Sequence, residues 1–306
     1  MSDKTRAIAV ETVEVTPEQA GQRIDNFLIK RLKGVPKTRL YRALRSGEVR
    51  VNGARKKASY QLCAGDRLRI PPLRCAAPGA APWIPDSLLE KIPILFEDRH
   101  LLVVDKPAGL AAHGGSGVQY GLIEALRTLR ADEPVLELAH RLDRDTSGCL
   151  ILAKSRAALL ALQAQLGVER SIDKDYAALI KGAWPGGNRE IDRPLARPPH
   201  AAGHKRSAAR SVFSPRRRWA ACTLVNIRLL TGRMHQARLH AAAIGQPIAG
   251  DRLYGDAGFN RMTRQAGLRR LFLHAERLRF AHPVSGAALE TRAPLPAALE
   301  AVLENL

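Results

Sequence analysis

The stretch HRLDRDTSGCLILA, residues 140–153, decides how the rest of this 306-residue sequence is interpreted. Its first nine residues are mostly polar, and its last five form an apolar run of the length of a strand. Polar side chains at the mouth of a buried strand are candidates for a functional site. Asp143 and Asp145 alternate with Arg141 and Arg144, so a carboxylate here should stay ionised. It could act as a nucleophile, a base or a metal ligand; a surface turn with local ion pairs is the alternative.

A second polar cluster, TGRMHQARLH, occupies residues 231–240. Thr231 is suited to cap a helix over residues 235–244, on which His235 and Arg238 would share one face. That face would offer forked donors to a carboxylate or a phosphate. A phosphate-binding helix or a purely structural basic helix is the alternative interpretation.

The tyrosines, histidines and cysteines limit the kinds of catalytic or metal site that the sequence can form. Tyr176 lies in an alternating stretch, residues 174–179, where an inward tyrosine is usually part of the core. The histidines do not form the spacing of a zinc hydrolase. The four cysteines stand far apart without a C-x-x-C pair, which argues against a zinc knuckle and against a disulfide framework. Isolated thiols favour a reducing cytoplasm.

The formal net charge of +20 is concentrated in two segments. Residues 23–57 contain 12 Lys and Arg against two acidic residues, and residues 200–240 contain nine against none. Two basic segments in an otherwise balanced chain predict a polyanionic partner. We expect nucleic acid rather than membrane, because no amphipathic helix with large apolar anchors accompanies the charge. No run of about 18 apolar residues predicts a membrane span, and no secretory or transit signal is expected at the N-terminus.

The pattern of periodicity and turns predicts a small basic unit and a larger domain. In the small unit, residues 23–32 and 37–46 are expected as helices, with a strand over 48–51 and a hairpin turn at Asn52-Gly53. The larger domain mixes short strand patterns with helical ones, which predicts an α+β fold with a mostly antiparallel sheet flanked by helices. The expected boundaries are an N-terminal arm at 1–20, the small unit at 21–72, a Pro- and Ala-rich linker at 73–90 and the large domain at 91–306.

HRLDRDTSG, residues 140–148, resembles the signature of the RluA-type pseudouridine synthases. The companion segments occur in the same order, namely residues 94–110, KDY at 174–176, residues 231–240, GDRLYG at 250–255 and residues 271–283. Residues 21–72 resemble an S4-type RNA-binding domain. The small unit also resembles the subgroup called the RluC type, which acts on large-subunit (23S) ribosomal RNA.

The resemblance implies isomerisation of specific uridines to pseudouridine without a cofactor or metal. It implies Asp143 as the catalytic carboxylate, Arg238 as its bidentate partner and Tyr176 beside the uracil. The first step is open between attack on the sugar, attack on the ring and a glycal route. Arg141 would fill the place of the flipped base, and Asp145 is given no catalytic role. Further substrate contacts are expected from His140, Lys174, Arg233, His235 and Gln236. RNA-phosphate contacts are expected from Lys37, Arg39, Arg42, Arg45, Arg50, Lys56 and Lys57.

Some positions depart from the family pattern. Asp105 replaces an Asn before Lys-Pro, and Ala237 replaces a larger aliphatic residue. Two other functions compete with the enzyme: a non-catalytic RNA-binding or ribosome-assembly factor, and a metal-dependent nuclease using Asp143 and Asp145. The intact set of implied catalytic residues argues against the first. Arginines rather than further carboxylates surround Asp143, which argues against the second. We expect a cytoplasmic monomer whose partner is 23S rRNA, as free rRNA or in the immature large subunit.

Overall fold

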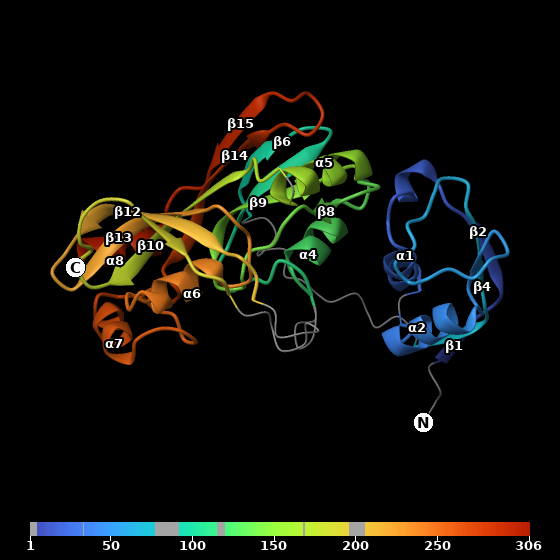
Figure 1. Ribbon diagram of the computed structural model, residues 1–306, viewed down its shortest axis with the longest axis horizontal. Coiled ribbons are helices and arrows are strands. Elements are labelled where there is room, and N and C mark those ends of the chain that lie inside the picture. Colours follow the sequence, from blue (N-terminus) through green and yellow to red (C-terminus); the bar gives the residue numbers. More distant parts are fainter. Residues whose placement is uncertain (1–4, 33, 77–91, 115–119, 168, 196–205) are drawn as a thin grey trace. The chain divides into compact units, whose positions relative to one another are not determined.

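The computed structural model describes residues 5–32, 34–76, 92–114, 120–167, 169–195 and 206–306. It divides into two compact units, Met1–Trp83 and Ile84–Leu306 (Figure 1). Residues 77–91, most of the predicted linker, lie outside the described part. None of the described helices is long and apolar enough to cross a membrane.

The first unit combines two helices with two small antiparallel sheets. Strands β2, β4 and β3 form one sheet in that order, and β1 pairs with β5. Its elements are β1 (Thr5–Ile8), β2 (Glu11–Glu14), the 3-10 helix η1 (Pro17–Gln19), α1 (Ile24–Arg31), α2 (Lys37–Ser46), β3 (Arg50–Val51), β4 (Arg67–Ile70) and β5 (Leu73–Ala76).

Helix α2 forms over the residues that periodicity predicts. Leu40, Ala43 and Leu44 are buried, so the helix has one apolar face that packs into the core of the unit. It ends at Gly47, whose φ of +76° is a left-handed conformation that glycine adopts without a Cβ clash. The remaining faces carry four basic residues, Lys37, Arg39, Arg42 and Arg45, together with Thr38, Tyr41 and Ser46.

The residues predicted as an N-terminal arm are part of this first unit. Strand β2 pairs in register with β4, Glu11 opposite Ile70 and Glu14 opposite Arg67. Because β3 covers only the other edge of β4, the sheet needs β2 to complete its backbone hydrogen bonds. The prediction of a separate arm is therefore corrected.

The second unit is built around one large mixed sheet with helices packed on it. Its elements are β6 (Ile94–Glu97), β7 (Leu101–Lys106), α4 (Leu122–Leu129), β8 (Glu137–Leu138), β9 (Ser147–Ala153), α5 (Arg156–Gly167), β10 (Asp173–Lys181), β11 (Arg189–Asp192), β12 (Arg210–Arg218), β13 (Cys222–Leu229), α6 (Gln236–Ala243), α7 (Ala257–Gln265), β14 (Leu273–Ala281), β15 (Ala288–Arg292) and α8 (Ala297–Glu304).

The strand order is β11-β12-β13-β10-β14-β9-β7-β6, with β15 on β14 and β8 on β9. Pairing is antiparallel except between β14 and β9, where His274 lies opposite Ser147 and Ala275 opposite Gly148. This confirms the predicted α+β fold with a mixed, mostly antiparallel sheet. Figure 1 shows the strands and the helices beside them.

Strand β9 is buried on both faces. Leu150 and Leu152 belong to the largest hydrophobic cluster, which also contains α4 residues. Cys149 and Ile151 belong to a second cluster that includes residues of α5. A strand covered on both faces needs apolar residues at every position, which explains the unbroken run after the polar segment. The polar segment is thereby placed at the mouth of a rigid central strand.

Candidate active site

Asp143 lies in the loop that leads from β8 into β9. Its side chain is 21% exposed, so it is reachable from solvent although the preceding Leu142 is buried. A turn closes the loop directly behind it, because the backbone N–H of Thr146 donates to the Asp143 carbonyl at 3.1 Å. The backbone thus fixes where the carboxylate emerges.

Lys106, at the end of β7, holds this loop through hydrogen bonds to backbone carbonyls. It is completely buried, and its Nζ donates to the carbonyls of Pro107 and Leu110 at 2.8 Å and of Arg144 at 3.1 Å. Burial lowers the pKa of the Lys106 ammonium to about 7, and the positive charge of Arg270 acts in the same direction. Three carbonyl acceptors need three N–H groups, which only the ammonium supplies, so these bonds favour the charged form. Sequence reasoning assigned Lys106 no role.

The other end of the loop is held by a chain of hydrogen bonds. Arg270 donates to the Ser147 hydroxyl at 2.7 Å, and that hydroxyl lies 2.8 Å from Nδ1 of His274. The opposite ring nitrogen, Nε2, lies 3.1 Å from the Ala293 carbonyl, which can only accept. His274 therefore carries its proton on Nε2, and Ser147 donates to Nδ1.

Gly148 permits the closest approach between β9 and β14. A Cβ at this position would lie 2.2 Å from the carbonyl oxygen of Ala275, and the φ of Gly148 is +113°. Only glycine fits both conditions. The glycine of the signature thus serves the strand pairing beneath Asp143.

Two basic side chains face the two oxygens of Asp143. Nη1 of Arg238 lies 3.6 Å from Oδ2, and Nε2 of His235 lies 3.8 Å from Oδ1. Both come from the start of α6, which brings the segment 231–240 against the loop of Asp143. These separations exceed hydrogen-bond length, as is common for catalytic groups before substrate is bound.

The bidentate pairing predicted between Arg238 and Asp143 is corrected. Arg238 donates from Nε and Nη2 to the two oxygens of Asp251, at 2.7 and 2.8 Å. Asp251 is 2% exposed, and its Oδ1 also accepts from the backbone N–H groups of Leu253 and Tyr254. Although burial opposes it, the Arg238 fork and these N–H groups hold the pKa of Asp251 below its usual range. The fork is occupied, so one nitrogen of Arg238 is left toward Asp143.

Thr231 does not cap helix α6. The helix begins at Gln236, and the residue before it, His235, is the N-cap with a left-handed φ of +54°. Thr231 instead donates its hydroxyl to Oε1 of Gln236 at 2.7 Å. His235 reaches Asp143 from this turn, so it does not share a helical face with Arg238 in the way the spacing predicts.

Gln236 is part of the scaffold beneath the site. It is 2% exposed, its Oε1 accepts from Thr231 and from the N–H of Arg233, and its Nε2 donates to the Arg210 carbonyl and the Ser211 hydroxyl. The amide has no free group for a substrate, which corrects its assignment as a substrate contact. Arg233 is exposed and donates to the Ala208 carbonyl at 3.2 Å.

Tyr176, on β10, is buried in the cluster that contains Leu142 and Ala237, the neighbours of Asp143 and Arg238. Burial, together with the negative charge of Asp143, raises the pKa of its phenol, so the hydroxyl stays protonated at neutral pH. Lys174, two residues earlier, lies on the same strand face and is 7% exposed. Burial lowers the pKa of Lys174.

His140 supports the loop from the side of the central strand. Its Nε2 accepts from the backbone N–H of Ile151 at 3.2 Å. Burial, with the nearby charge of Lys174, lowers the pKa of His140 to about 4, so the ring is neutral under ordinary conditions. The remaining signature residues Arg141, Arg144 and Asp145 are exposed.

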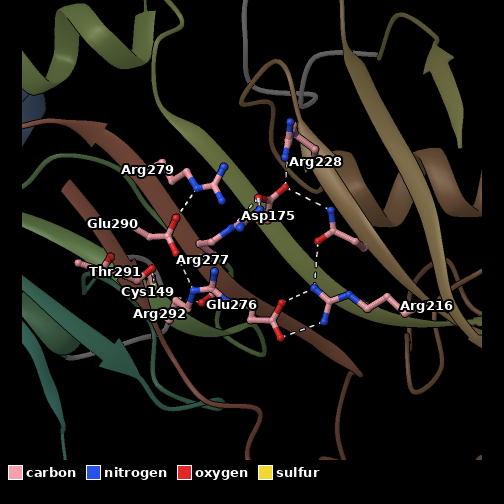
Figure 2. A network of polar contacts seen from close by, with 11 residues as sticks. Cys149, Asp175, Arg216, Arg228, Glu276, Arg277, Arg279, Glu290, Thr291 and Arg292 are labelled. Carbon is pink, nitrogen blue, oxygen red and sulfur yellow. Dashed lines mark hydrogen bonds and ion pairs between the residues drawn. The ribbon is translucent and has the colours of Figure 1, made fainter. Parts of the chain in front are cut away.

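The opposite face of β10 carries an ion-pair network (Figure 2). Asp175 is 1% exposed and accepts from Nε of Arg228 on β13 and Nε of Arg277 on β14, both at 3.0 Å. Arg216 on β12 pairs with Glu276 on β14 in the same network. Because side chains alternate along a strand, these pairs hold β10 from behind while Lys174 and Tyr176 face the site.

In the first unit, the residues predicted to contact RNA lie mainly at the surface. Lys37, Arg42, Arg45, Arg50 and Lys57 are exposed. Arg50 donates to the carbonyls of Gly47 and Gly53.

Two members of this set have side-chain partners. Arg39 pairs with Glu48 at 2.6 Å, and Lys56 lies over the ring of Tyr60 at 4.8 Å. These partners neutralise or fix part of the basic surface.

The arrangement around Asp143 fits chemistry at an ionised carboxylate. Two basic side chains face it, a protonated phenol lies beside it, and hydrogen bonds fix its loop at both ends. Positively charged or donor groups aimed at a carboxylate keep it ionised and directed. Among the described residues, no group of three His, Cys, Asp or Glu side chains could hold a metal ion.

Comparisons with known proteins agree with this geometry. The sequence pattern described as RNA pseudouridylate synthase matches residues 100–243, and that described as S4 domain matches residues 22–68. The chain is 46% identical over 309 residues to "Ribosomal large subunit pseudouridine synthase C" of Pasteurella multocida, covering 97% of this chain and 94% of that protein. It is 45% identical over 315 residues to the protein of the same name from Escherichia coli K12, covering 99% and 98%. Among solved structures, "Human RNA Pseudouridylate Synthase Domain Containing 4" aligns with a TM-score of 0.58 at 25% identity, over 72% of this chain and 94% of that one.

Proposed function

This chain belongs to the RNA pseudouridylate synthase family, and from that premise we propose that it isomerises specific uridines of large-subunit (23S) ribosomal RNA, with Asp143 as the catalytic carboxylate. The observation that carries the proposal is the meeting of Asp143 with Arg238, His235 and Tyr176, which come from three separate chain segments. The relatives named for large-subunit RNA cover nearly the whole chain, which supports the substrate.

The reaction breaks the bond between the sugar and N1 of uracil and joins the sugar to C5. The proton leaves C5 and N1 gains one, so atoms balance without an external reagent. Asp143 supplies the ionised carboxylate that attacks or abstracts a proton, and Arg238 supports its negative charge. Tyr176 lies against the uracil and, as a protonated phenol, can donate a hydrogen bond.

We assign the exposed Arg141 to the space vacated by the flipped base, since unstacking the target costs about a few kcal/mol that a filling side chain offsets. Lys174 adds positive potential next to the site. The S4 match over residues 22–68 supports the proposal that the first unit holds the RNA through its basic residues, and we propose that it does so in the cytoplasm. We propose that it acts as a monomer, on free rRNA or the immature large subunit.

The test is pseudouridine mapping on large-subunit rRNA from a deletion strain complemented with variants. Asp143→Asn keeps the shape of the side chain but removes its charge, and we expect no pseudouridine at the sites that the wild type restores. RNA affinity should remain within about twofold, because the carboxylate makes no attractive contact with phosphate.

Asp145→Asn is the matched control, since Asp145 lies two residues away in the same loop and is exposed. It should restore modification fully. Normal modification by Asp143→Asn would refute the assignment of the carboxylate. A change confined to transfer RNA would refute the substrate.

A further inference from the structure

Tyr254 lies where the two basic partners of Asp143 meet. Its hydroxyl is 2.9 Å from Nδ1 of His235, and its ring centre is 5.0 Å from the guanidinium carbon of Arg238. Its backbone N–H donates to Oδ1 of Asp251 at 3.0 Å, and Asp251 is the residue that holds the Arg238 fork. One residue thus contacts both His235 and Arg238, and also the carboxylate that binds Arg238.

The Tyr254 hydroxyl and the Asp143 carboxylate together select which nitrogen of His235 carries a proton, because a phenol can donate or accept whereas a carboxylate only accepts. In the neutral ring one nitrogen donates and the other accepts. A phenol that donates to Nδ1 leaves the proton on Nε2, and Nε2 is the atom that faces Oδ1 of Asp143 at 3.8 Å. The other tautomer would direct a lone pair at the carboxylate, which is repulsive.

The ring contact restrains Arg238. A guanidinium over the face of tyrosine gains a cation–π attraction. The same ring meets His235 edge-on, with 5.7 Å between ring centres. Truncating the ring would therefore disturb both basic partners, whereas removing only the hydroxyl would disturb His235 alone.

We propose that Tyr254 is a positioning residue: its hydroxyl holds the neutral His235 ring in the tautomer whose Nε2–H is directed at Asp143, while its ring and backbone keep the Arg238–Asp251 pair in place. This rests on the proposed function of Asp143. Tyr254 touches no reacting atom and acts through His235 and Arg238.

The first experiment measures kcat and KM of Tyr254→Phe at pH 8. We expect kcat about tenfold below that of the wild type, the equivalent of one hydrogen bond, with KM within about twofold.

A double-mutant cycle with His235→Ala tests whether the Tyr254 hydroxyl acts on the rate through His235. If Tyr254 acts through His235, its hydroxyl has no further effect on the rate in the His235→Ala background. Thr263→Val is the matched control, because it removes a fully buried hydroxyl that bonds only within α7, and its rate should equal that of the wild type. A deficit that is additive in the cycle overturns the proposal.

A measurement on the wild type needs no variant to fold. In ¹⁵N-histidine-labelled protein at pH 8, long-range proton–nitrogen spectra should show His235 protonated at Nε2. A proton on Nδ1 contradicts the proposal directly. If Asp143→Asn is inactive and the wild type active while Tyr254→Phe behaves as wild type, the inference about Tyr254 fails and the proposed function stands. If the wild-type protein forms no pseudouridine, the proposed function itself fails.

Discussion

The guanidinium of Arg238 binds Asp251 with both prongs of its fork, Nε at 2.7 Å and Nη2 at 2.8 Å. Because the fork is occupied, only Nη1 is left to face the carboxylate of Asp143. A buried acid therefore fixes the orientation of the arginine before RNA arrives, and Asp143 remains accessible to the substrate. Ion pairs buried in this way lose their value when one partner becomes neutral.

Asp251→Asn should accordingly impair both stability and turnover. We expect the free energy of unfolding in urea to fall by about 3 kcal/mol, since a buried guanidinium loses its counter-charge. The rate should fall by about tenfold to a hundredfold, because Arg238 is no longer fixed toward Asp143. Asp256→Asn, at the N-cap of α7, is the comparison and should leave both stability and rate nearly unchanged, because Asn caps a helix about as well as Asp. Equal rates for both variants would contradict the role given to Asp251.

Gly148→Ala should destabilise the join between β9 and β14. The new Cβ would lie 2.2 Å from the Ala275 carbonyl oxygen at a φ of +113°, so the strands must separate locally. We expect a loss of about 3 kcal/mol in the free energy of unfolding and a loss of activity.

Gly286→Ala is the control that has an unfavourable backbone conformation but no steric clash. Its φ is +72°, but nothing lies within 4 Å of the added Cβ. It should cost about 1 kcal/mol and leave activity unchanged. If the two alanine variants unfold at the same urea concentration, the close approach of β9 and β14 is not the cause.

His140 should make the protein sensitive to mild acid. The unfolded ring takes up a proton near its ordinary pKa of about 6.5, whereas the folded ring does so only near 4. Between these values the unfolded state binds more protons, so the contribution of His140 to stability is complete above about pH 6.5 and is lost as the pH falls toward 4. His140→Gln keeps an acceptor for the Ile151 N–H and does not titrate. Urea unfolding at pH 7 and pH 5 should show a smaller difference for this variant than for wild type; an identical difference would exclude His140 as the cause.

Arg42 and Arg45 should contribute to RNA affinity mainly through phosphate. Both are exposed on α2. Replacing each with Gln should lower the slope of log affinity against log salt concentration by about 0.7 to 0.9 per residue. Arg39→Gln should change the slope less, because its guanidinium already pairs with Glu48. A slope unchanged in the Arg42 and Arg45 variants would count against RNA binding by this face.

Local patterns predicted much of the architecture. The apolar positions of α2 recur with helical spacing and Gly47 follows them, so both its face and its end were predictable. The helices predicted at 23–32 and 235–244 begin and end within a residue or so of α1 and α6. The run after Gly148 is apolar because both faces of β9 are covered.

The partners of Arg238 were not predictable in the same way. Asp251 lies 13 residues away, and nothing in local periodicity indicates that a chain reversal after α6 brings it to the guanidinium. Asp143 is the partner that the resemblance suggests, so the fork was assigned to the wrong carboxylate. The roles of Lys106 and Tyr254 were missed for a related reason. Each depends on a contact with a residue distant in sequence, Lys106 with the Arg144 carbonyl and Tyr254 with His235. The indication available in the sequence was that Lys106 and Tyr254 lie in segments 94–110 and 250–255, which resemble conserved-order segments of the family.

Strand β14 contributes none of the residues assigned to the reaction, yet it stands between β10 and β9 in the sheet. Asp143 belongs to the side of the sheet with β9, whereas Tyr176, His235 and Arg238 belong to the side with β10 and β13. All of them precede Leu273 in the chain. Every residue assigned to the reaction is therefore synthesised before β14, which begins in about the last ninth of the 306-residue sequence, and we expect the site to form only after that strand has been made.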